Sequence, residues 1–329
     1  MELTLMPEVA KGIKLSIIIV CFNGREVLIP CLESIWKAVP SFPFEVILVD
    51  NGSKDNSVQE VHRRFQDVII IQSGYNAGYA GGNNIGFARA RGQYVLFLNP
   101  DTIIHEGTFD RLVGRADSDP TIGIVGPSVQ DAGGPRQPGC FRAPRIRDAL
   151  AMAFWLYRIP GYVKAYGFPG RYRENQYKDE MEADVVTGCC LLARKAVLKD
   201  VGVFDEEYFV YFEETDLCER VRKHGYKILY DPSASIVHAG GATTIKYEIW
   251  CRIQKERNEC LFFAKHRGRW HAWVICAVQL VNYFMRVFLG SMVVVGSGGR
   301  AKSVAHTVYY ASRLLFWRVG IQKQGERPS

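Results

Sequence analysis

Short apolar runs alternate with segments of helical spacing through the first part of the chain. Runs rich in β-branched residues lie at 14–21, 44–49, 68–71, 94–98 and 122–125. Between these runs, apolar residues recur every three or four positions at 25–39, 57–65, 83–91 and 105–116. Buried strands that alternate with amphipathic helices are typical of a mostly parallel sheet joined by right-handed crossovers. The pattern therefore predicts an α/β fold.

The regular pattern ends at Gly126. Residues 127–178 are rich in Gly, Pro, Arg and Tyr, and within them 146–157 has helical spacing. Long irregular segments in compact domains are usually functional or mobile, and this one could cover a site. Ordered segments return at 183–193 and 204–212, and a helix over 215–224 and a strand over 227–230 follow.

The chain changes again near residue 250. Basic residues cluster between 252 and 269, and an apolar stretch at 270–295 contains Arg286. A transmembrane helix needs about 20 mostly apolar residues, and this stretch also holds an asparagine and a glutamine. We expect this stretch and a second one at 305–317 to lie on a membrane face with basic residues toward the headgroups. The alternative is a helical subdomain packed on the core or on a second subunit.

Composition narrows the class of protein. The chain is 48% apolar and 23% charged, which suits a globular protein with a sizeable core. A net charge of +7 allows an anionic ligand or membrane as partner but is too small to indicate nucleic acid. Nine scattered cysteines form no CxxC pair, which argues against a structural zinc site. No secretory signal precedes Lys14, and we expect a cytoplasmic protein.

An acidic residue follows the strand at 94–98. That strand runs into Asn99-Pro100-Asp101, and proline ends it. Asp101 therefore lies beyond the carboxyl end of a strand, where open α/β sheets bind ligands. His238 follows an apolar pair at a strand end, where a histidine is more often structural than a metal ligand. It becomes a candidate ligand only if it reaches Asp101. Together the two would suit Mn²⁺ or Mg²⁺.

Two turn-like motifs could meet a ligand. Asp50-Asn51-Gly52-Ser53 follows the second strand, where Asp50 could accept a hydrogen bond from a base or ribose, although the motif is also a good turn. Residues 76–86 are rich in glycine, and the helix that follows could favour phosphate at its amino end. A nicotinamide-dependent oxidoreductase is the competing interpretation, but the spacing is not GxGxxG and the motif is not in the first strand–helix turn.

Acidic residues at 213–216 follow an aromatic run and open a helix. Glu214 lies near the helix amino end, which favours the charged form, while burial by the aromatic residues raises its pKa. Such a group can act as a general base. The alternative is a helix cap formed by Glu213 or Glu214, with Asp216 in the first turn.

Seven segments in order resemble one known family. They are KLSIIIVCFNG, VILVDNGSKD, NAGYAGGNNIGFARARG, YVLFLNPDT, VTGCCLLARK, GVFDEEYFVYFEETDLCERVRKHGYKI and VHAGG. Together they resemble a family 2 glycosyltransferase with a GT-A fold, of the rhamnosyltransferase-like branch, over 14–265. One departure is Asn99, which stands where the family's DxD motif has its first acid.

The resemblance implies inverting transfer of a sugar from a nucleotide donor, aided by a divalent cation. It implies that Asp101 and His238 bind the metal and that Glu214 is the catalytic base, with Glu213 and Asp216 binding the acceptor or orienting the base. The donor site would be lined by Asn23, Asp50, Asn76, Gly78, Gly82, Asn84, Asn99 and Asp101.

The resemblance also implies a domain organisation and partners. We expect an N-terminal extension at 1–13, a GT-A domain at 14–249 with an irregular acceptor-side segment at 127–180, and a helical, membrane-associating region at 250–329. The expected partners are a dTDP- or UDP-sugar, with dTDP-L-rhamnose favoured, a lipid-linked or glycan acceptor, and an anionic membrane on its cytoplasmic face. A second copy could bind through the C-terminal region. A nucleotide-sugar-binding protein without catalysis is the alternative function.

Overall fold

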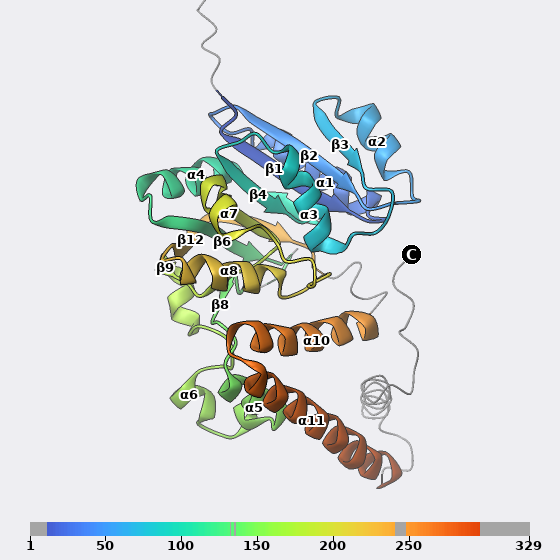
Figure 1. Cartoon of the computed structure of the whole chain (residues 1–329), viewed down its shortest axis with the longest axis vertical. Coiled ribbons are helices and arrows are strands. Elements are labelled where there is room, and N and C mark those ends of the chain that lie inside the picture. The colour runs from blue at the N-terminus through green and yellow to red at the C-terminus, as the bar shows by residue number, and fades with distance from the viewer. Residues whose placement is uncertain (1–11, 132, 135, 241–247, 297–329) are drawn as a thin grey trace, which may run out of the picture.

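A central sheet with helices on both faces forms the upper part of the molecule, and two long helices lie below it (Figure 1). The structure, a computed structural model, describes residues 12–131, 133–134, 136–240 and 248–296. The predicted N-terminal extension, apart from residues 12 and 13, and the second amphipathic stretch at 305–317 lie outside the described residues.

The sheet has the strand order β3-β2-β1-β4-β11-β6-β12-β5. Its strands are β1 (Leu15–Cys21), β2 (Phe44–Asp50), β3 (Val68–Gln72), β4 (Tyr94–Leu98), β5 (Thr102–Ile104), β6 (Ile122–Gln130), β11 (Cys190–Arg194) and β12 (Lys227–His238). The strands from β3 to β4 are parallel, and β11 runs antiparallel to β4 and β6. The predicted mostly parallel α/β fold is confirmed.

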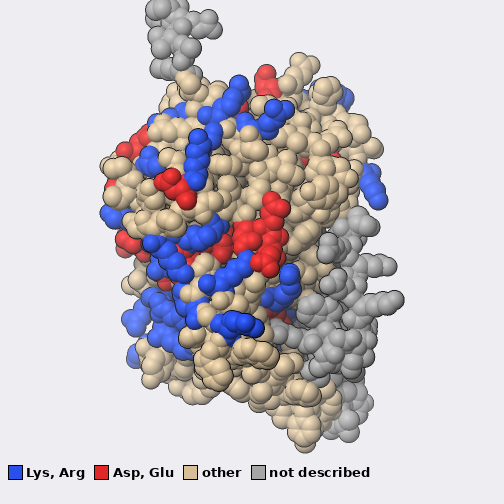
Figure 2. Space-filling model, in the orientation of Figure 1, with Lys and Arg blue, Asp and Glu red and all other residues tan. Residues whose placement is uncertain are grey.

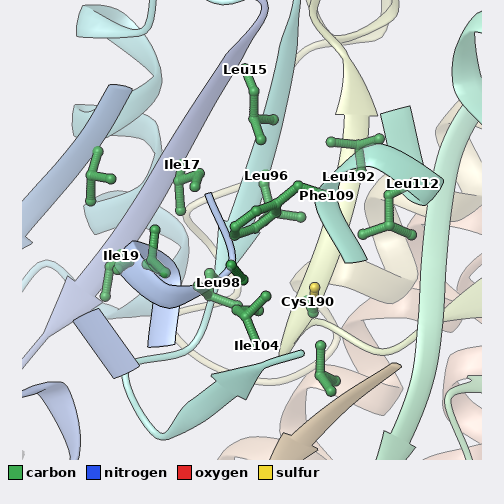
Figure 3. Close-up of a cluster of buried hydrophobic side chains, with 14 of the residues drawn as sticks. Leu15, Ile17, Ile19, Leu96, Leu98, Ile104, Phe109, Leu112, Cys190 and Leu192 are labelled. Carbon is green, nitrogen blue, oxygen red and sulfur yellow. The ribbon is translucent and has the colours of Figure 1, made fainter. Parts of the chain in front are cut away.

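Helices cover both faces of this sheet. They are α1 (Arg25–Lys37), α2 (Ser57–Arg64), α3 (Gly78–Arg89), α4 (Thr108–Ser118), α7 (Lys195–Val201) and α8 (Glu213–Lys223). Successive strand residues point to opposite faces. Ile17 and Ile19 therefore join Leu96, Phe109 and other apolar side chains in one buried cluster (Figure 3).

The other sheet face has its own apolar cluster. Ile18 and Val20 pack there with Ala80 of α3 and with Leu217 and Val221 of α8. This second cluster holds α3 and α8 on the same side of the sheet, and this places the amino ends of both helices near the candidate site.

The glycine-rich segment is helical from Gly78, five residues earlier than predicted. Added Cβ atoms at Gly82 and Gly86 would lie 2.6 Å from Val20 Cγ1 and 2.5 Å from Ile18 Cγ2. These two glycines therefore let α3 approach β1 closely. The sequence signal was interpreted as a loop because isolated glycines disfavour helix, and close packing on the sheet overrides that preference.

The irregular segment begins later than predicted. β6 continues through Pro127 to Gln130. Proline lacks an N–H donor, and the pairing of β6 with β12 shifts register between Asp231 and Ser235, next to Pro127. The rest of the segment contains β7 (Arg136–Gln137), β8 (Cys140–Phe141), α5 (Ile146–Ala153) and α6 (Tyr162–Tyr166), with 3-10 turns at Leu156–Arg158 and Glu174–Lys178.

The last described helices are α10 (Glu248–His266) and α11 (Arg269–Gly296). They pack against each other, and α5 packs on α11, where Asn282 donates a hydrogen bond to the Ala153 carbonyl. By length and composition alone, Arg269–Leu289 could cross a membrane, and 22% of its most apolar window is buried. Two short strands, β9 (Met181–Glu182) and β10 (Val185–Val186), pair with β12 and β8.

Candidate active site

The predicted metal ligands meet at the carboxyl end of β4. β4 ends at Leu98, and β12 pairs with β5 so that His238 lies opposite Thr102. His238 Nε2 lies 3.2 Å from Asp101 Oδ1 and 3.3 Å from Asn99 Nδ2. His238 therefore reaches Asp101, which was the condition for interpreting it as a ligand.

The Asp101–His238 pair fits part of a divalent-metal site. Adjacent ligands of an octahedral Mg²⁺ or Mn²⁺ lie about 3 Å apart, because each metal–ligand bond is about 2.1 Å. The 3.2 Å separation of Oδ1 and Nε2 agrees with that geometry. No group of three His, Cys, Asp or Glu that could hold a metal occurs among the described residues. A metal held here would complete its coordination with substrate phosphate oxygens and water.

The predicted nucleoside-binding residues form one turn at the neighbouring strand ends. β1 and β2 are parallel and place Cys21 opposite Asp50. The Asp50 carboxylate accepts hydrogen bonds from the Ser53 amide at 3.1 and 3.3 Å. Asn23 Oδ1 accepts one from the Lys54 amide at 2.7 Å. Asp50 is buried, so its carboxylate orders this turn in the described structure.

The remaining predicted donor-site residues hold the chain around α3. Asn76 Oδ1 accepts a hydrogen bond from the Gly78 amide at 3.0 Å, and Gly78 packs closely against Phe209. Asn84 Nδ2 donates to the Phe204 carbonyl at 2.8 Å and to Glu206 at 2.9 Å. Contacts of Asn84 and Gly82 with donor stay predictions, because the described contacts of both residues are structural.

Asn51 is a site neighbour that the sequence analysis did not select. Its Nδ2 donates to the Gly78 carbonyl at 2.9 Å, and its buried Oδ1 has no partner among the described residues. Asn51 thus ties the Asp50 turn to the start of α3. Its position between Asp50 and Gly52 was the available signal, since asparagine is favoured in such turns for its own hydrogen bonds.

Glu213 and Glu214 form the first turn of α8 behind two residues of left-handed backbone. Tyr211 and Phe212 have φ of 68° and 73°. Such conformations are costly for bulky residues and are often found at functional sites. One carboxylate oxygen of each glutamate, Oε2, is buried without a hydrogen-bond partner among the described residues.

Burial changes the proton affinity of both glutamates. Burial is the main cause that raises the pKa of Glu214, and backbone hydrogen bonds at the helix start oppose it. Burial and the neighbouring charge of Glu214 raise the pKa of Glu213 well above its usual value. Burial therefore opposes ionisation of both glutamates, and the charge of Glu214 further opposes ionisation of Glu213.

Gly188 and Cys189 connect the two parts of the site. A Cβ at Gly188 would lie 3.4 Å from Glu214 Cβ, and the Cys189 carbonyl accepts a hydrogen bond from the Asn99 amide at 2.9 Å. Tyr79 of α3 donates its hydroxyl to the Gly188 carbonyl at 2.7 Å. This short turn therefore lies between the Asp101 motif and Glu214.

Asp216 has a different environment from its two neighbours. It accepts hydrogen bonds from Arg220 Nε at 2.8 Å and pairs with His266 Nε2 at 2.7 Å. Burial alone would raise the pKa of Asp216, but the contacts with His266 and Arg220 outweigh it and lower the pKa. Asp216 therefore joins α8 to α10, and the predicted acceptor contact stays a prediction.

A pocket of 390 Å³ lies away from these residues. It is lined by Ala143, Pro144, Arg145, Ile146, Asp184, Arg222, Phe263, Arg267 and His271. None of the predicted site residues lines it, and Arg222 lies at the opposite end of α8 from Glu214.

Comparison with known proteins identifies the family of the chain and agrees with the fold. Residues 16–202 match the family model described as Glycosyl transferase family 2. The chain is 30% identical over 246 residues to an N-acetylglucosaminyl-diphospho-decaprenol L-rhamnosyltransferase of Mycobacterium tuberculosis, covering 70% of this chain and 78% of the relative.

Two solved structures share the fold. One is a mannosyltransferase from Pyrobaculum calidifontis in complex with GDP-Man and Mn²⁺, at 15% identity and a TM-score of 0.55, covering 95% of this chain and 90% of that one. The other is GalNAc-T7 with UDP, GalNAc and Mn²⁺, at 14% identity and a TM-score of 0.57, covering 94% of this chain and 56% of that one. The expected GT-A fold is confirmed.

Proposed function

The chain belongs to glycosyl transferase family 2, and we propose that it transfers a sugar with inversion from a nucleotide-sugar donor to an acceptor hydroxyl. The observation that carries this proposal is the convergence of two groups on the Gly188–Cys189 turn. Asp101 and His238 meet on one side of it, and Glu214 contacts it from the other. A diphosphate-binding pair and a base must flank the reacting carbon in a direct displacement.

Glu214 is the proposed base. Its carboxylate takes the proton of the acceptor hydroxyl while the hydroxyl oxygen forms a bond to the anomeric carbon. The bond from this carbon to the donor diphosphate breaks, and its electron pair leaves with the diphosphate. A raised pKa increases the proton affinity of Glu214 and brings it closer to a working pH. The left-handed backbone at Tyr211 and Phe212 helps to fix the glutamate.

Asp101 and His238 are the proposed ligands of Mn²⁺ or Mg²⁺. When bound, the divalent ion offsets the charge that develops on the departing diphosphate. In the described structure the side-chain amide of Asn99 lies 3.3 Å from His238 Nε2, the nitrogen that would bind the metal. The replacement of the first DxD acid by Asn99 leaves one carboxylate in this motif. His238 would therefore supply a larger part of the protein's coordination of the metal.

The best supported donor is dTDP-L-rhamnose, and UDP-sugars are the next candidates. The similarity to an L-rhamnosyltransferase supports this choice of sugar. The same relative is named for an acceptor in which a sugar is joined through diphosphate to a lipid. We extend both properties to this chain and propose a role in cell-surface polysaccharide synthesis.

Association with the cytoplasmic face of a membrane would bring the enzyme to a lipid-linked acceptor. One side of α11 exposes a row of large apolar side chains, which are Trp270, Trp273, Phe284, Phe288 and Met292. In Figure 2 the surface around α11 lacks charge, and Lys and Arg side chains gather directly above it. An apolar face bordered by cations suits the boundary of an anionic bilayer.

Ligand-dependent melting tests the proposed function. We expect dTDP with Mn²⁺ to raise the melting temperature, and NAD to have no effect, because a ligand stabilises the state to which it binds. The variant Asp101→Ala should lose the metal-dependent part of this rise in melting temperature. The control variant Asp200→Ala, at an exposed residue, should keep it. Stabilisation by NAD alone would contradict the proposal.

A donor screen tests catalysis. Release of nucleoside diphosphate from dTDP-rhamnose should require a lipid-diphosphate-linked N-acetylglucosamine acceptor. Binding of the nucleotide without turnover of any nucleotide sugar, in the presence of membrane extract, would favour a non-catalytic binding protein instead.

A further inference from the structure

One face of α10 lies against the segment that carries the proposed base. Residues 251, 255, 258, 262 and 266 share this face because they are three or four positions apart. Asn258 Nδ2 donates to the Val210 and Tyr211 carbonyls, both at 2.9 Å. Phe262 packs on Phe212 with ring centroids 6.0 Å apart. This face of α10 therefore follows the chain that leads directly into Glu213.

Lys255 differs from its neighbours on this face. Asn258 and Phe262 are buried and partnered, and His266 is paired with Asp216. Lys255 is exposed and has no hydrogen bond or ion pair among the described residues. It lies one turn from Asn258, beside the start of α8. Burial raises the pKa of Glu214, and the positive charge of Lys255 is among the causes that oppose the rise. The ammonium group is thus placed near the proposed base without a carboxylate of its own.

The positive charge continues from Lys255 toward α11. Arg252 is one turn before Lys255 on α10 and is paired with Glu256 at 3.4 Å. Gln279 of α11 donates to the Glu256 carbonyl at 3.3 Å, which fixes how the two helices lie side by side. Two turns further along α11, Arg286 lies over the Trp155 ring at 5.1 Å and has no ion pair among the described residues.

Apolar surface begins where these cations end. Phe284 and Phe288 flank Arg286 in sequence on α11 and are 59% and 67% exposed. The order from the base outward is therefore Glu214, Lys255, Arg252 and an exposed apolar face. A sugar joined through diphosphate to a lipid has the same order of chemistry, with a hydroxyl, one sugar ring, two phosphates and a hydrocarbon chain.

We propose that Lys255, continued by Arg252, forms a binding site for the diphosphate of a lipid-linked acceptor whose sugar hydroxyl Glu214 deprotonates. This inference rests on the proposed function for the identity of the reaction. It adds the requirement that the acceptor be anionic next to its reacting sugar. Lysine suits this task because its compact charge on a flexible stem follows a phosphate as the acceptor moves.

Binding of farnesyl diphosphate tests the site without turnover. Binding is measured by calorimetry with EDTA and saturating dTDP, so that the donor site is blocked. We expect Lys255→Gln to weaken binding roughly tenfold or more, because a charge-assisted hydrogen bond is lost, and Lys255→Arg to restore most of it. The matched control is Arg257→Gln, which removes an exposed cation two residues away on a different face of α10 and should leave binding unchanged.

Two outcomes would overturn the site. One is equal affinity of wild type and Lys255→Gln for farnesyl diphosphate. The other is an equal loss in Arg257→Gln, which would indicate general attraction to a basic helix. Farnesol serves as an uncharged probe, and its binding should not depend on Lys255.

Turnover separates this inference from the proposed function. With a lipid-diphosphate-linked sugar, Lys255→Gln should raise KM roughly tenfold. With an uncharged alkyl glycoside of the same sugar, KM should be unchanged. If wild type transfers sugar to neither acceptor, the proposed function fails, and farnesyl diphosphate binding still decides whether the site exists.

Discussion

Two adjacent glutamates differ in the groups that act on their ionised forms. Glu214 has backbone hydrogen bonds and the charge of Lys255 to stabilise its ionised form. Glu213 has the charge of Glu214 against it, in addition to burial. A glutamine imitates a protonated glutamate in shape and charge but cannot accept a proton at physiological pH. Substitution by glutamine therefore distinguishes a base from a neutral neighbour.

The glutamine variants should have unequal activities. We expect Glu214→Gln to lower kcat by roughly 10²-fold or more, since general base catalysis is lost, and to keep donor binding. Glu213→Gln should stay within a few-fold of wild type. Initial rates at saturating donor and acceptor measure both. The assignment is wrong if Glu214→Gln remains active or if Glu213→Gln is the more damaged variant.

The buried Glu213 also predicts how stability depends on pH. Its pKa in the folded protein lies above the ordinary 4.5, so the folded state binds more protons than the unfolded chain above that pH. The stability contribution of protonated Glu213 is therefore present below about pH 4.5 and is lost as pH rises through the folded pKa.

The substitution Glu213→Gln should remove this loss of stability at higher pH. The melting temperature of Glu213→Gln minus that of wild type should grow as pH rises above 4.5. Glu26→Gln, at an exposed carboxylate of α1, should show no such trend. A difference that is constant with pH would mean that Glu213 is ionised in the folded protein.

At the scale of the elements, the long buried strands were easier to predict than the short strands and the strand directions. The five apolar runs of the first part became β1, β2, β3, β4 and β6 because β-branched residues in short runs suit buried strands. β5 has three residues and follows the turn that contains Asp101, so its pattern was too short to be recognised. The antiparallel direction of β11 depends on a connection that local periodicity does not encode.

The site was predictable where each residue is fixed by its own strand or helix. Asp101 and Glu214 follow directly from the end of β4 and the start of α8. Lys255 was not predicted as part of the site, because its position depends on α10 packing against residues 210–216. The contact between Asp216 and His266 was not predicted either, because the two residues are 50 positions apart in the sequence.

The tether between α8 and α10 gives a prediction about stability. Asp216→Asn removes the carboxylate charge that compensates Arg220 and weakens the contact with His266, and Asp216 is buried. Breaking a buried ion pair in this way costs about 3 kcal/mol of unfolding free energy. Urea unfolding measures the change, and the exposed Asp200→Asn should lie within about 0.5 kcal/mol of wild type. Equal stability of Asp216→Asn and wild type would mean that the tether contributes nothing.

At the scale of the whole molecule, the proposed membrane face is the exposed side of α11. Wild type should sediment with vesicles that contain anionic lipid, and high salt should weaken this because it screens the basic residues. Replacing Phe284 and Phe288 together by glutamate should release the protein, whereas Val39→Glu, at an exposed apolar residue after α1, should not. Unchanged sedimentation of the double variant would favour a helical subdomain that packs on protein.

The configuration of the newly formed glycosidic bond tests the central claim most directly. A single base at Glu214, and a leaving diphosphate bound by a metal that Asp101 and His238 would hold, require attack from the face opposite the leaving group. Nuclear magnetic resonance of the product from a donor of known configuration measures the outcome. The account predicts an anomeric configuration opposite to that of the donor, and a product that retains the donor configuration would contradict it.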